Sequence, residues 1–282
     1  MFVWASAFVA IRGIGDSFSP GSLALGRLIV GSIALTIFAL PRAKPFPRGK
    51  TLWFIVGYGV TWFAIYNIAL NAAETHLDAG TTALIINIGP ILIAIFAGLF
   101  LGEGFPPGLI IGCVIAFSGV ALIAIGGQTG KHATVTTAGV LLCLLAAVAY
   151  STGVILQKFV LKSVAPLPAT WIGCMVGGVV CLPFGPGLVR DTADASWAHI
   201  GWVVYLGLFP TAIAFVLFAY VLKRLNAGLV SATTYIVPAI VTLLSWIILD
   251  ETPAAIAFVG GALCLLGVAV TRIRRRVVAP VV

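Results

Sequence analysis

Long apolar segments separated by short polar ones fill almost the whole chain. The pattern predicts ten helices, most of them about 20 residues long, which is the length that crosses roughly 30 Å of hydrocarbon at 1.5 Å per residue. We place these helices at Met1–Ile14, Pro20–Leu40, Lys50–Ala73, Ala79–Leu101, Pro107–Ile125, Thr137–Leu161, Pro166–Leu188, Ala198–Leu222, Ala227–Leu249 and Ala254–Arg272. Because Arg12 interrupts the apolar run of the first helix, we expect that some residues of the native helix are missing from its start.

Composition assigns the chain to the integral membrane proteins. Of its 282 residues, 61% are hydrophobic and 9% are charged, and the mean hydropathy is +1.17. Soluble domains have about half apolar and a quarter charged residues. All five cysteines lie in apolar runs and lack the spacing of metal ligands, so we expect no disulfide, no metal and no cofactor.

Basic residues gather on one side of the predicted membrane span. With both termini in the cytoplasm, twelve of the 16 Lys and Arg residues fall on the inner side, as the positive-inside rule expects. The outer side then carries most of the acidic residues, namely Asp16, Glu74, Asp78, Asp191, Asp194, Asp250 and Glu251. We therefore predict a multi-pass protein of the bacterial inner membrane whose basic tail, residues 273–282, lies in the cytoplasm against anionic lipid rather than nucleic acid.

One stretch of the sequence occurs twice at a constant distance. Residues 77–123 align without a gap on residues 225–271, so that Pro238 follows Pro90 by 148 residues and Glu251 follows Glu103 by the same distance. Residues 1–125 and 137–272 thus form two repeats of five predicted helices each. Because five is odd, the second repeat enters the membrane inverted, and inverted repeats are typical of secondary transporters with a substrate site near the midplane.

The sequence also resembles a known family. The opening W-A-S-A-F-V-A-I-R, the F-S-P at residues 18–20, an Arg inside the second helix and the duplicated L-x-A-G … P … E are similar to EamA-type carriers of the drug/metabolite transporter superfamily. This resemblance implies ten helices, inward-facing termini and a central cavity lined mainly by the first, third, fourth, sixth, eighth and ninth helices. Within the superfamily, the chain most resembles bacterial exporters of aromatic and other neutral amino acids.

Three prolines inside predicted helices are candidates for gating. Pro90 and Pro238 are equivalent in the two repeats, and each leaves the carbonyl four residues earlier without its helical donor, which favours a kink. Pro210 in the eighth helix is a third kink, without a partner proline in the first repeat. Kinks that only hold helices together are the alternative interpretation.

Aromatic and hydroxyl side chains near the middle of several helices are candidates for substrate binding. Tyr58, Trp62 and Tyr66 recur every four residues and share one helix face. The further candidates are Trp4, Tyr150, Asn87, Thr234 and Tyr235. Such a wall, with polar groups for hydrogen bonds, suits a solute with a planar or apolar side chain. For each of these residues, ordinary helix packing remains the alternative.

Arg27 is the charged residue that the pattern places inside a helix, about 10 Å below the outer surface at 1.5 Å per residue. It either snorkels outward in a structural role or faces the cavity and binds a substrate carboxylate. All acidic residues fall at helix ends or in turns, so an intramembrane carboxylate for ion coupling is not apparent.

These observations together predict a carrier, not an enzyme, that exports small organic solutes, above all aromatic or neutral amino acids, by alternating access. A carrier for nucleotide sugars or drugs, a membrane-embedded enzyme and a channel are the alternatives. The expected partners are a small-molecule substrate and the lipid bilayer. We expect a monomer, with a dimer through the Gly108-x-x-x-Gly112 face as the alternative.

Overall fold

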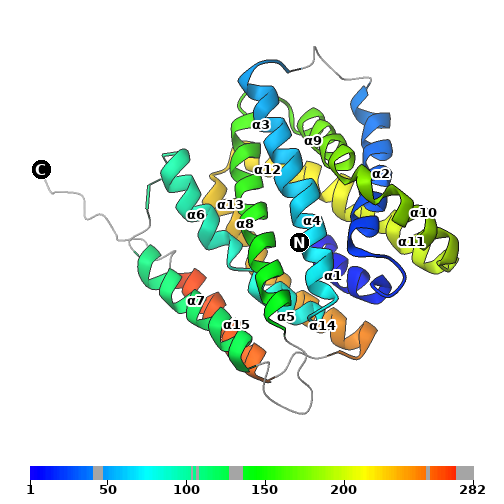
Figure 1. Cartoon of the computed structure of the whole chain (residues 1–282). Helices are drawn as coiled ribbons and strands as arrows, with labels where there is room; N and C mark the ends of the chain where they lie inside the picture. The colour runs from blue at the N-terminus through cyan, green and yellow to red at the C-terminus, as the bar shows by residue number, and fades with distance from the viewer. Residues whose placement is uncertain (41–46, 103, 106–107, 127–135, 252–254, 271–282) are drawn as a thin grey trace, which may run out of the picture.

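The computed structural model is built of helices and describes residues 1–40, 47–102, 104–105, 108–126, 136–251 and 255–270, in which no strand occurs (Figure 1). Within this part of the chain, seven helical segments are long and apolar enough to cross a membrane. Three shorter apolar helices, Phe2–Ile14, Ile111–Ile123 and Ala255–Val270, fall where further crossings are predicted. The all-helical membrane class is therefore confirmed, and crossing by all ten segments stays a prediction. Glu103 and the tail at 273–282 lie outside the described residues.

Five predicted helices are continuous and five are divided. The continuous ones are α1 (Phe2–Ile14), α2 (Pro20–Ala39), α7 (Leu109–Gly126), α8 (Thr137–Val160) and α15 (Ala255–Val270). The third divides into α3 (Lys50–Tyr58), η2 (Gly59–Ile65) and α4 (Tyr66–Glu74), and the fourth into α5 (Ala79–Ile86) and α6 (Gly89–Phe100). The seventh becomes α9 (Pro166–Cys181), η3 (Leu182–Phe184) and α10 (Gly185–Asp194), six residues longer than the sequence indicated.

The eighth and ninth helices divide at positions equivalent to those of the third and fourth. The eighth consists of α11 (Trp197–Leu206), η4 (Gly207–Ile213) and α12 (Ala214–Arg224). The ninth consists of α13 (Ala227–Ala232), η5 (Thr233–Ile236) and α14 (Val237–Leu249). The π-helices η2 and η4 begin 148 residues apart, and so do α6 and α14.

Proline accounts for the breaks in the fourth and ninth helices, although not as the kinks that the sequence predicts. Pro90 and Pro238 each occupy the second position of a new helix, α6 and α14, where a backbone N–H would have no partner within that helix in any case. Pro210 lies inside the π-helix η4, and the hydroxyl of Thr211 donates to the carbonyl of Leu206 five residues earlier. The equivalent η2 has no proline, so this geometry does not depend on proline alone.

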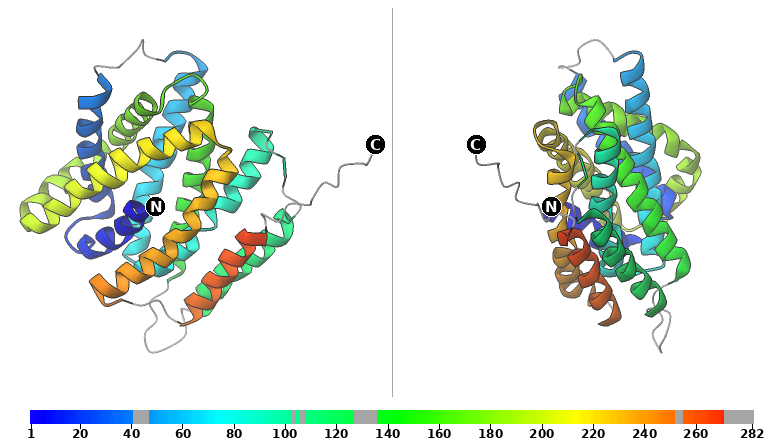
Figure 2. Two further views of the ribbon diagram at one scale, coloured as in Figure 1. Left: turned by 180° about the vertical axis from the view of Figure 1, so that it is seen from behind. Right: turned by 90° about the vertical axis from the view of Figure 1, so that its left-hand side faces the viewer.

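Helices of one sequence repeat pack against helices of the other repeat. α2 packs on η4, and its counterpart α9 packs on η2, while α1 packs on α14 and α6 packs on α8. α7 and α15 form a pair at one edge of the bundle (Figures 1 and 2). They run antiparallel, because Gly119 lies against the carbonyl of Gly260 and Gly267 against that of Gly112.

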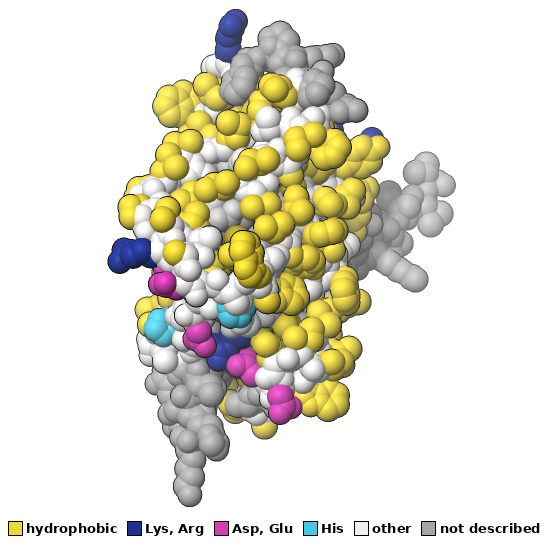
Figure 3. All heavy atoms as spheres, turned by 90° about the vertical axis from the view of Figure 1, so that its right-hand side faces the viewer, with side chains coloured by type: hydrophobic (Ala, Val, Ile, Leu, Met, Phe, Trp, Pro, Cys, Tyr) yellow, Lys and Arg dark blue, Asp and Glu magenta, His cyan; other side chains and the backbone are white. Residues whose placement is uncertain are grey.

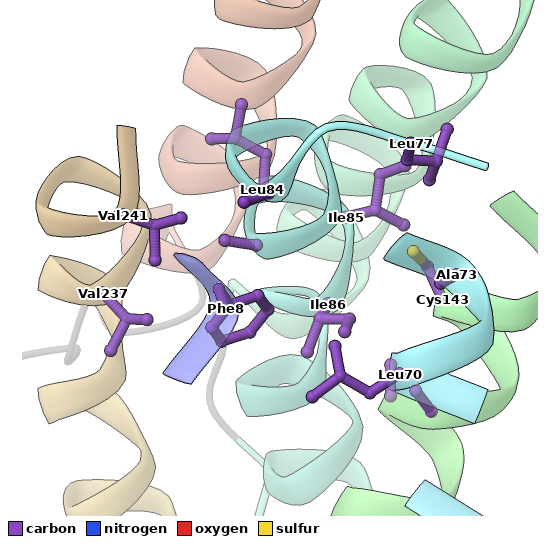
Figure 4. Packing of buried hydrophobic residues seen from close by; sticks show 14 of the residues in the cluster. Phe8, Leu70, Ala73, Leu77, Leu84, Ile85, Ile86, Cys143, Val237 and Val241 are labelled. Atoms are coloured by element: carbon purple, nitrogen blue, oxygen red, sulfur yellow. The ribbon is translucent and has the colours of Figure 1, made fainter. Parts of the chain in front are cut away.

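Apolar side chains occupy both the interior and the outer surface. Phe8, Ile85 and Val241 belong to one buried cluster, part of which is drawn in Figure 4. Large hydrophobic residues such as Ile37 and Trp53 are exposed on the outside. The face in Figure 3 is mostly hydrophobic, with acidic and histidine side chains near its lower end. A hydrophobic outer surface is what a lipid environment requires.

Candidate functional site: a buried aromatic cavity

A cavity of about 70 Å³ lies where helices from both sequence repeats meet, and most of its lining side chains are buried. The lining side chains are Trp4, Ala7, Phe8, Arg27, Trp62, Tyr66, Leu70, Ala83, Ile86, Asn87, Pro90, Tyr150, Phe215, Thr234 and Val237. Figure 4 shows four of them, Phe8, Leu70, Ile86 and Val237, from close by. The walls thus come from the six helices that the family resemblance implies and, through Arg27, from the second helix.

Aromatic rings form a continuous wall of this cavity. Trp62 is 1% exposed, and its ring centroid lies 4.8 Å from that of Phe215 and 5.3 Å from that of Tyr150. Trp4 lies edge-on to Phe215 with a centroid separation of 5.6 Å. Tilted and edge-to-face pairs at these separations are favourable beyond their burial. The wall is therefore preorganised to contact an apolar or planar group.

Arg27 places a positive charge in this wall and does not snorkel to the surface, because its side chain is only 3% exposed. Its Nε donates to Thr211 Oγ1 at 3.0 Å and so ties α2 to η4. Its Nη1 is buried without a hydrogen-bond partner among the described residues. A buried guanidinium nitrogen without a partner is costly unless an anion or a polar ligand meets it.

Three further polar groups line the cavity. The Asn87 amide nitrogen and the Tyr150 hydroxyl have no hydrogen-bond partner in the described part of the chain. The hydroxyl of Thr234 donates to the carbonyl of Ser231 at 2.7 Å. Its oxygen can still accept a hydrogen bond. Asn87 stands at the break between α5 and α6 and is part of the cavity lining.

Four of the residues that the sequence predicts for substrate binding or gating lie outside the cavity lining. Tyr58 is fully buried, and its hydroxyl accepts a 2.7 Å hydrogen bond from Gln157, as expected of a packing residue. Pro210 contributes its carbonyl to Trp4 Nε1 at 3.2 Å, so it positions a lining residue. Tyr235 is partly buried beside the core, and Pro238 is buried at the start of α14.

Sequence reasoning missed Phe8, Phe215 and Glu74. The two phenylalanines carried no signal, because phenylalanine is frequent throughout an apolar chain. Glu74 was assigned to an outer loop, but it is the last residue of α4 and only 2% exposed. The signal that could have found it is the period-four stripe of Trp62 and Tyr66, which continues through Leu70 to Glu74.

The two helix breaks support a specific prediction. Pro90→Ala and Pro238→Ala restore a backbone donor and a good helix former, so we expect α5–α6 and α13–α14 to become more continuous and less able to bend. Transport should slow several-fold, while the folded yield, measured by size-exclusion chromatography, changes little. Pro166→Ala at the first position of α9 is the control. Equal losses of yield and transport in the two break variants would show that the prolines serve structure alone.

A multi-pass, all-helical membrane protein organised around a buried aromatic cavity is the class that the fold and this site define. The chain belongs to the EamA-like transporter family, whose family model matches residues 1–125 and 137–273. Family and relatives are transporters, which agrees with the expectation of a carrier rather than an enzyme.

Named relatives cover nearly the whole chain. A protein of Streptantibioticus cattleyicolor named a probable terminal-alkyne amino-acid exporter is 38% identical over 265 residues, which span 94% of this chain and 88% of that protein. The uncharacterized transporter YdfC of Bacillus subtilis is 34% identical over 96% of this chain and 88% of its own length. A solved crystal structure shares the fold, with a TM-score of 0.62 at 19% identity over 96% of this chain and 95% of that one.

Proposed function

We propose that this protein exports small amino acids with apolar or aromatic side chains across the bacterial inner membrane. In this proposal, ten helices cross the membrane as two inverted repeats, 1–125 and 137–272, with both termini in the cytoplasm. The 148-residue offset shared by η2 and η4 and by α6 and α14 supports the two repeats. The two separate matches of the family model, residues 1–125 and 137–273, support the same division.

The contacts between the two repeats suggest how the protein would open its cavity to one side of the membrane at a time. Each π-helix packs on a helix of the other repeat, η2 on α9 and η4 on α2. The cavity lies between these contacts, so rocking one repeat against the other opens it to one side at a time. Pro90 and Pro238 stand at the breaks beside the cavity, where the helices bend with the least loss of hydrogen bonds.

The observation that carries the proposal is the Arg27 nitrogen that has no hydrogen-bond partner among the described residues, in a cavity with an aromatic wall. A substrate carboxylate satisfies this nitrogen by a charge-assisted hydrogen bond. The rings of Trp4, Trp62 and Phe215 then face the substrate's side chain. The relative from Streptantibioticus cattleyicolor, named for amino-acid export, supports the same substrate class.

Rival substrates fit this cavity less well. A cationic drug requires a carboxylate in the wall, whereas the charged residue in the lining is Arg27. A nucleotide sugar carries two or more negative charges, whereas the lining offers the single charged side chain of Arg27. The equivalent glycine faces of α7 and α15 pack against each other within one chain. We therefore expect the carrier to work as a monomer, since these faces are not free to form a dimer contact.

Purified protein in liposomes tests the proposal directly. Liposomes preloaded with unlabelled solute should take up labelled leucine, phenylalanine or tryptophan by exchange, and should take up lysine, glutamate and glucose more slowly. Protein-free liposomes give the background. Exchange of none of the neutral amino acids, or equal exchange of all six solutes, contradicts the proposal.

A further inference from the structure

A second hollow, a groove of about 390 Å³, lies between α2 and the segment formed by η4 and α12, with the start of α9 beside it. Every side chain that lines this groove is apolar. Leu35 and Ala212 are buried in it, whereas Phe38, Ile213 and Leu217 are exposed. The groove therefore has a buried floor and rims that face the surroundings of the protein, which for a membrane-spanning bundle are lipid.

The groove has the depth of one leaflet of a bilayer. Its lining residues lie in the second half of α2 and between Leu208 and Leu217 of η4 and α12, toward the helix ends that are cytoplasmic in the proposed orientation. At 1.5 Å per residue, the wall from Leu208 to Leu217 is about 14 Å long. This length is close to half of a hydrocarbon core that is about 30 Å thick.

On α12, the face that lines the groove continues to an aromatic and two basic residues. Tyr220 follows Leu217 by three residues, and Lys223 and Arg224 follow Tyr220 by three and four, so these side chains share one face. Tyr220, Lys223 and Arg224 are all exposed. The Arg224 guanidinium lies 3.5 Å from the centroid of the Tyr220 ring. This order of apolar, aromatic and basic side chains is typical of a helix that leaves the hydrocarbon through the headgroup region.

Neutral groups hold the two cations in place and leave their charge uncompensated. Lys223 Nζ donates to the carbonyl of Val164 at 3.4 Å, and Arg224 Nη1 donates to the carbonyl of Tyr220 at 3.0 Å. Neither α2, α9, η4 nor α12 contains Asp or Glu. The groove and its basic end are thus complementary to a molecule with an apolar chain and an anionic head.

We propose that this groove binds an anionic phospholipid of the cytoplasmic leaflet. One acyl chain lies between α2 and α12, and the phosphate accepts charge-assisted hydrogen bonds from Lys223 and Arg224. The site is separate from the proposed substrate cavity. Because α2 belongs to the first sequence repeat and η4 and α12 belong to the second, the lipid contacts both repeats. It therefore stabilises the arrangement of the repeats in which the groove exists.

The groove and the central cavity share the wall formed by η4 and α12. Thr211 accepts from Arg27 of the cavity at 3.0 Å and directly precedes Ala212 of the groove. Phe215 lines the cavity, and the next residue, Val216, lines the groove. A lipid that holds η4 against α2 therefore supports the contact between Arg27 and Thr211.

A second copy of this chain fits the groove less well than a lipid. Dimers in membranes are mostly related by a twofold axis. An axis along the membrane normal at this groove would bring Lys223 and Arg224 of one copy close to the same residues of the other copy. Like charges at such a contact repel each other, whereas a phosphate attracts both residues.

Native mass spectrometry of the purified full chain in detergent tests the site, with phosphatidylglycerol and phosphatidylcholine of identical acyl chains as probes. A basic residue near an anionic head contributes about 1 kcal/mol, or about fivefold in affinity. With two such residues, we expect one phosphatidylglycerol to bind about 25-fold more tightly than phosphatidylcholine. Equal binding of the two lipids, or a dimer that forms without lipid and excludes both, would overturn the proposal. No amino acid is present, so this result does not depend on the proposed transport function.

Two variants place the lipid in the groove. Ala34→Phe fills the groove with a ring and should abolish the tight binding of phosphatidylglycerol. Lys223→Gln combined with Arg224→Gln should weaken this binding about 25-fold and leave that of phosphatidylcholine unchanged. Ala262→Phe, at an exposed position of α15, and Lys50→Gln, at the exposed start of α3, are the matched controls and should bind like the wild type.

The melting temperature gives a second measurement of the same site. Phosphatidylglycerol should raise the melting temperature of the wild type and of both controls, because a ligand of the folded state stabilises it. It should raise that of the Lys223→Gln and Arg224→Gln double variant much less. The double variant changes only exposed side chains, so it decides the question even if Ala34→Phe does not fold. A double variant that binds phosphatidylglycerol as tightly as the wild type would overturn the assignment.

Discussion

Arg27→Gln is expected to weaken the binding of leucine by about 10- to 150-fold while the protein stays folded. Hydrogen bonds to charged groups contribute about 1.5–3 kcal/mol, which corresponds to this range. Glutamine keeps a hydrogen-bond donor for Thr211 but removes the charge that meets a carboxylate. Leucinamide has no carboxylate, so its binding should change little.

Thr211→Val separates the two roles of Arg27. This change removes the hydrogen bond from Arg27 Nε to the Thr211 hydroxyl but leaves the guanidinium in the cavity. We expect a lower melting temperature, since such a bond contributes about 1 kcal/mol, with an unchanged ratio of leucine to leucinamide affinity. If Arg27→Gln reduces both affinities together and lowers the melting temperature, Arg27 serves to hold α2 against η4 and does not bind substrate.

Gly119→Ala and Gly267→Ala are each expected to remove most of the folded protein. A Cβ at Gly119 would lie 2.4 Å from the carbonyl oxygen of Gly260, and a Cβ at Gly267 would lie 2.5 Å from that of Gly112. Backbone atoms cannot rotate away, so α7 and α15 must separate. Overpacking of this kind destabilises by about 1–3 kcal/mol and occasionally more. The separation would also break the contact of Cys264 Sγ with the Ala116 carbonyl.

The two glycines should behave alike, because they occupy equivalent positions in the repeats. Fluorescence-detected size exclusion after heating would compare their melting temperatures with that of Gly178→Ala. At Gly178 the nearest atom to a new Cβ is 3.9 Å away, so this control should fold as well as the wild type. Normal stability of both variants would show that the close approach of α7 and α15 does not hold the protein together.

The sequence predicts apolar segments well because membrane crossing depends on local hydropathy. Period-four spacing selects Trp62 and Tyr66 for one helix face, and both line the cavity. Tyr58 lies on the same face one turn earlier, but its hydroxyl contacts Gln157 and not the cavity. What a side chain contacts depends on which helix packs opposite it, and the spacing does not reveal that helix. That they bind substrate stays a prediction.

Two features were not predicted from the sequence. The π-helices η2 and η4 arise from a shift in backbone pairing, and η2 contains no proline that would signal it. The burial of Glu74 depends on α1 and α8, which close over the end of α4 from distant parts of the chain. Hydropathy alone places such a carboxylate in water. By contrast, the matched Pro90 and Pro238 did indicate an irregularity in the fourth and ninth helices, although a kink was expected and not a break.

Photochemical labelling tests the central claim most directly, namely that the aromatic cavity binds an amino acid. A leucine analogue that carries a diazirine would be irradiated with the purified protein, and the modified residues would be identified by mass spectrometry. The cavity account predicts labels on Trp62, Tyr66, Tyr150 or their lining neighbours, and it predicts that excess leucine abolishes them. Labels confined to residues outside the cavity lining, or cavity labels that excess leucine leaves unchanged, would contradict it.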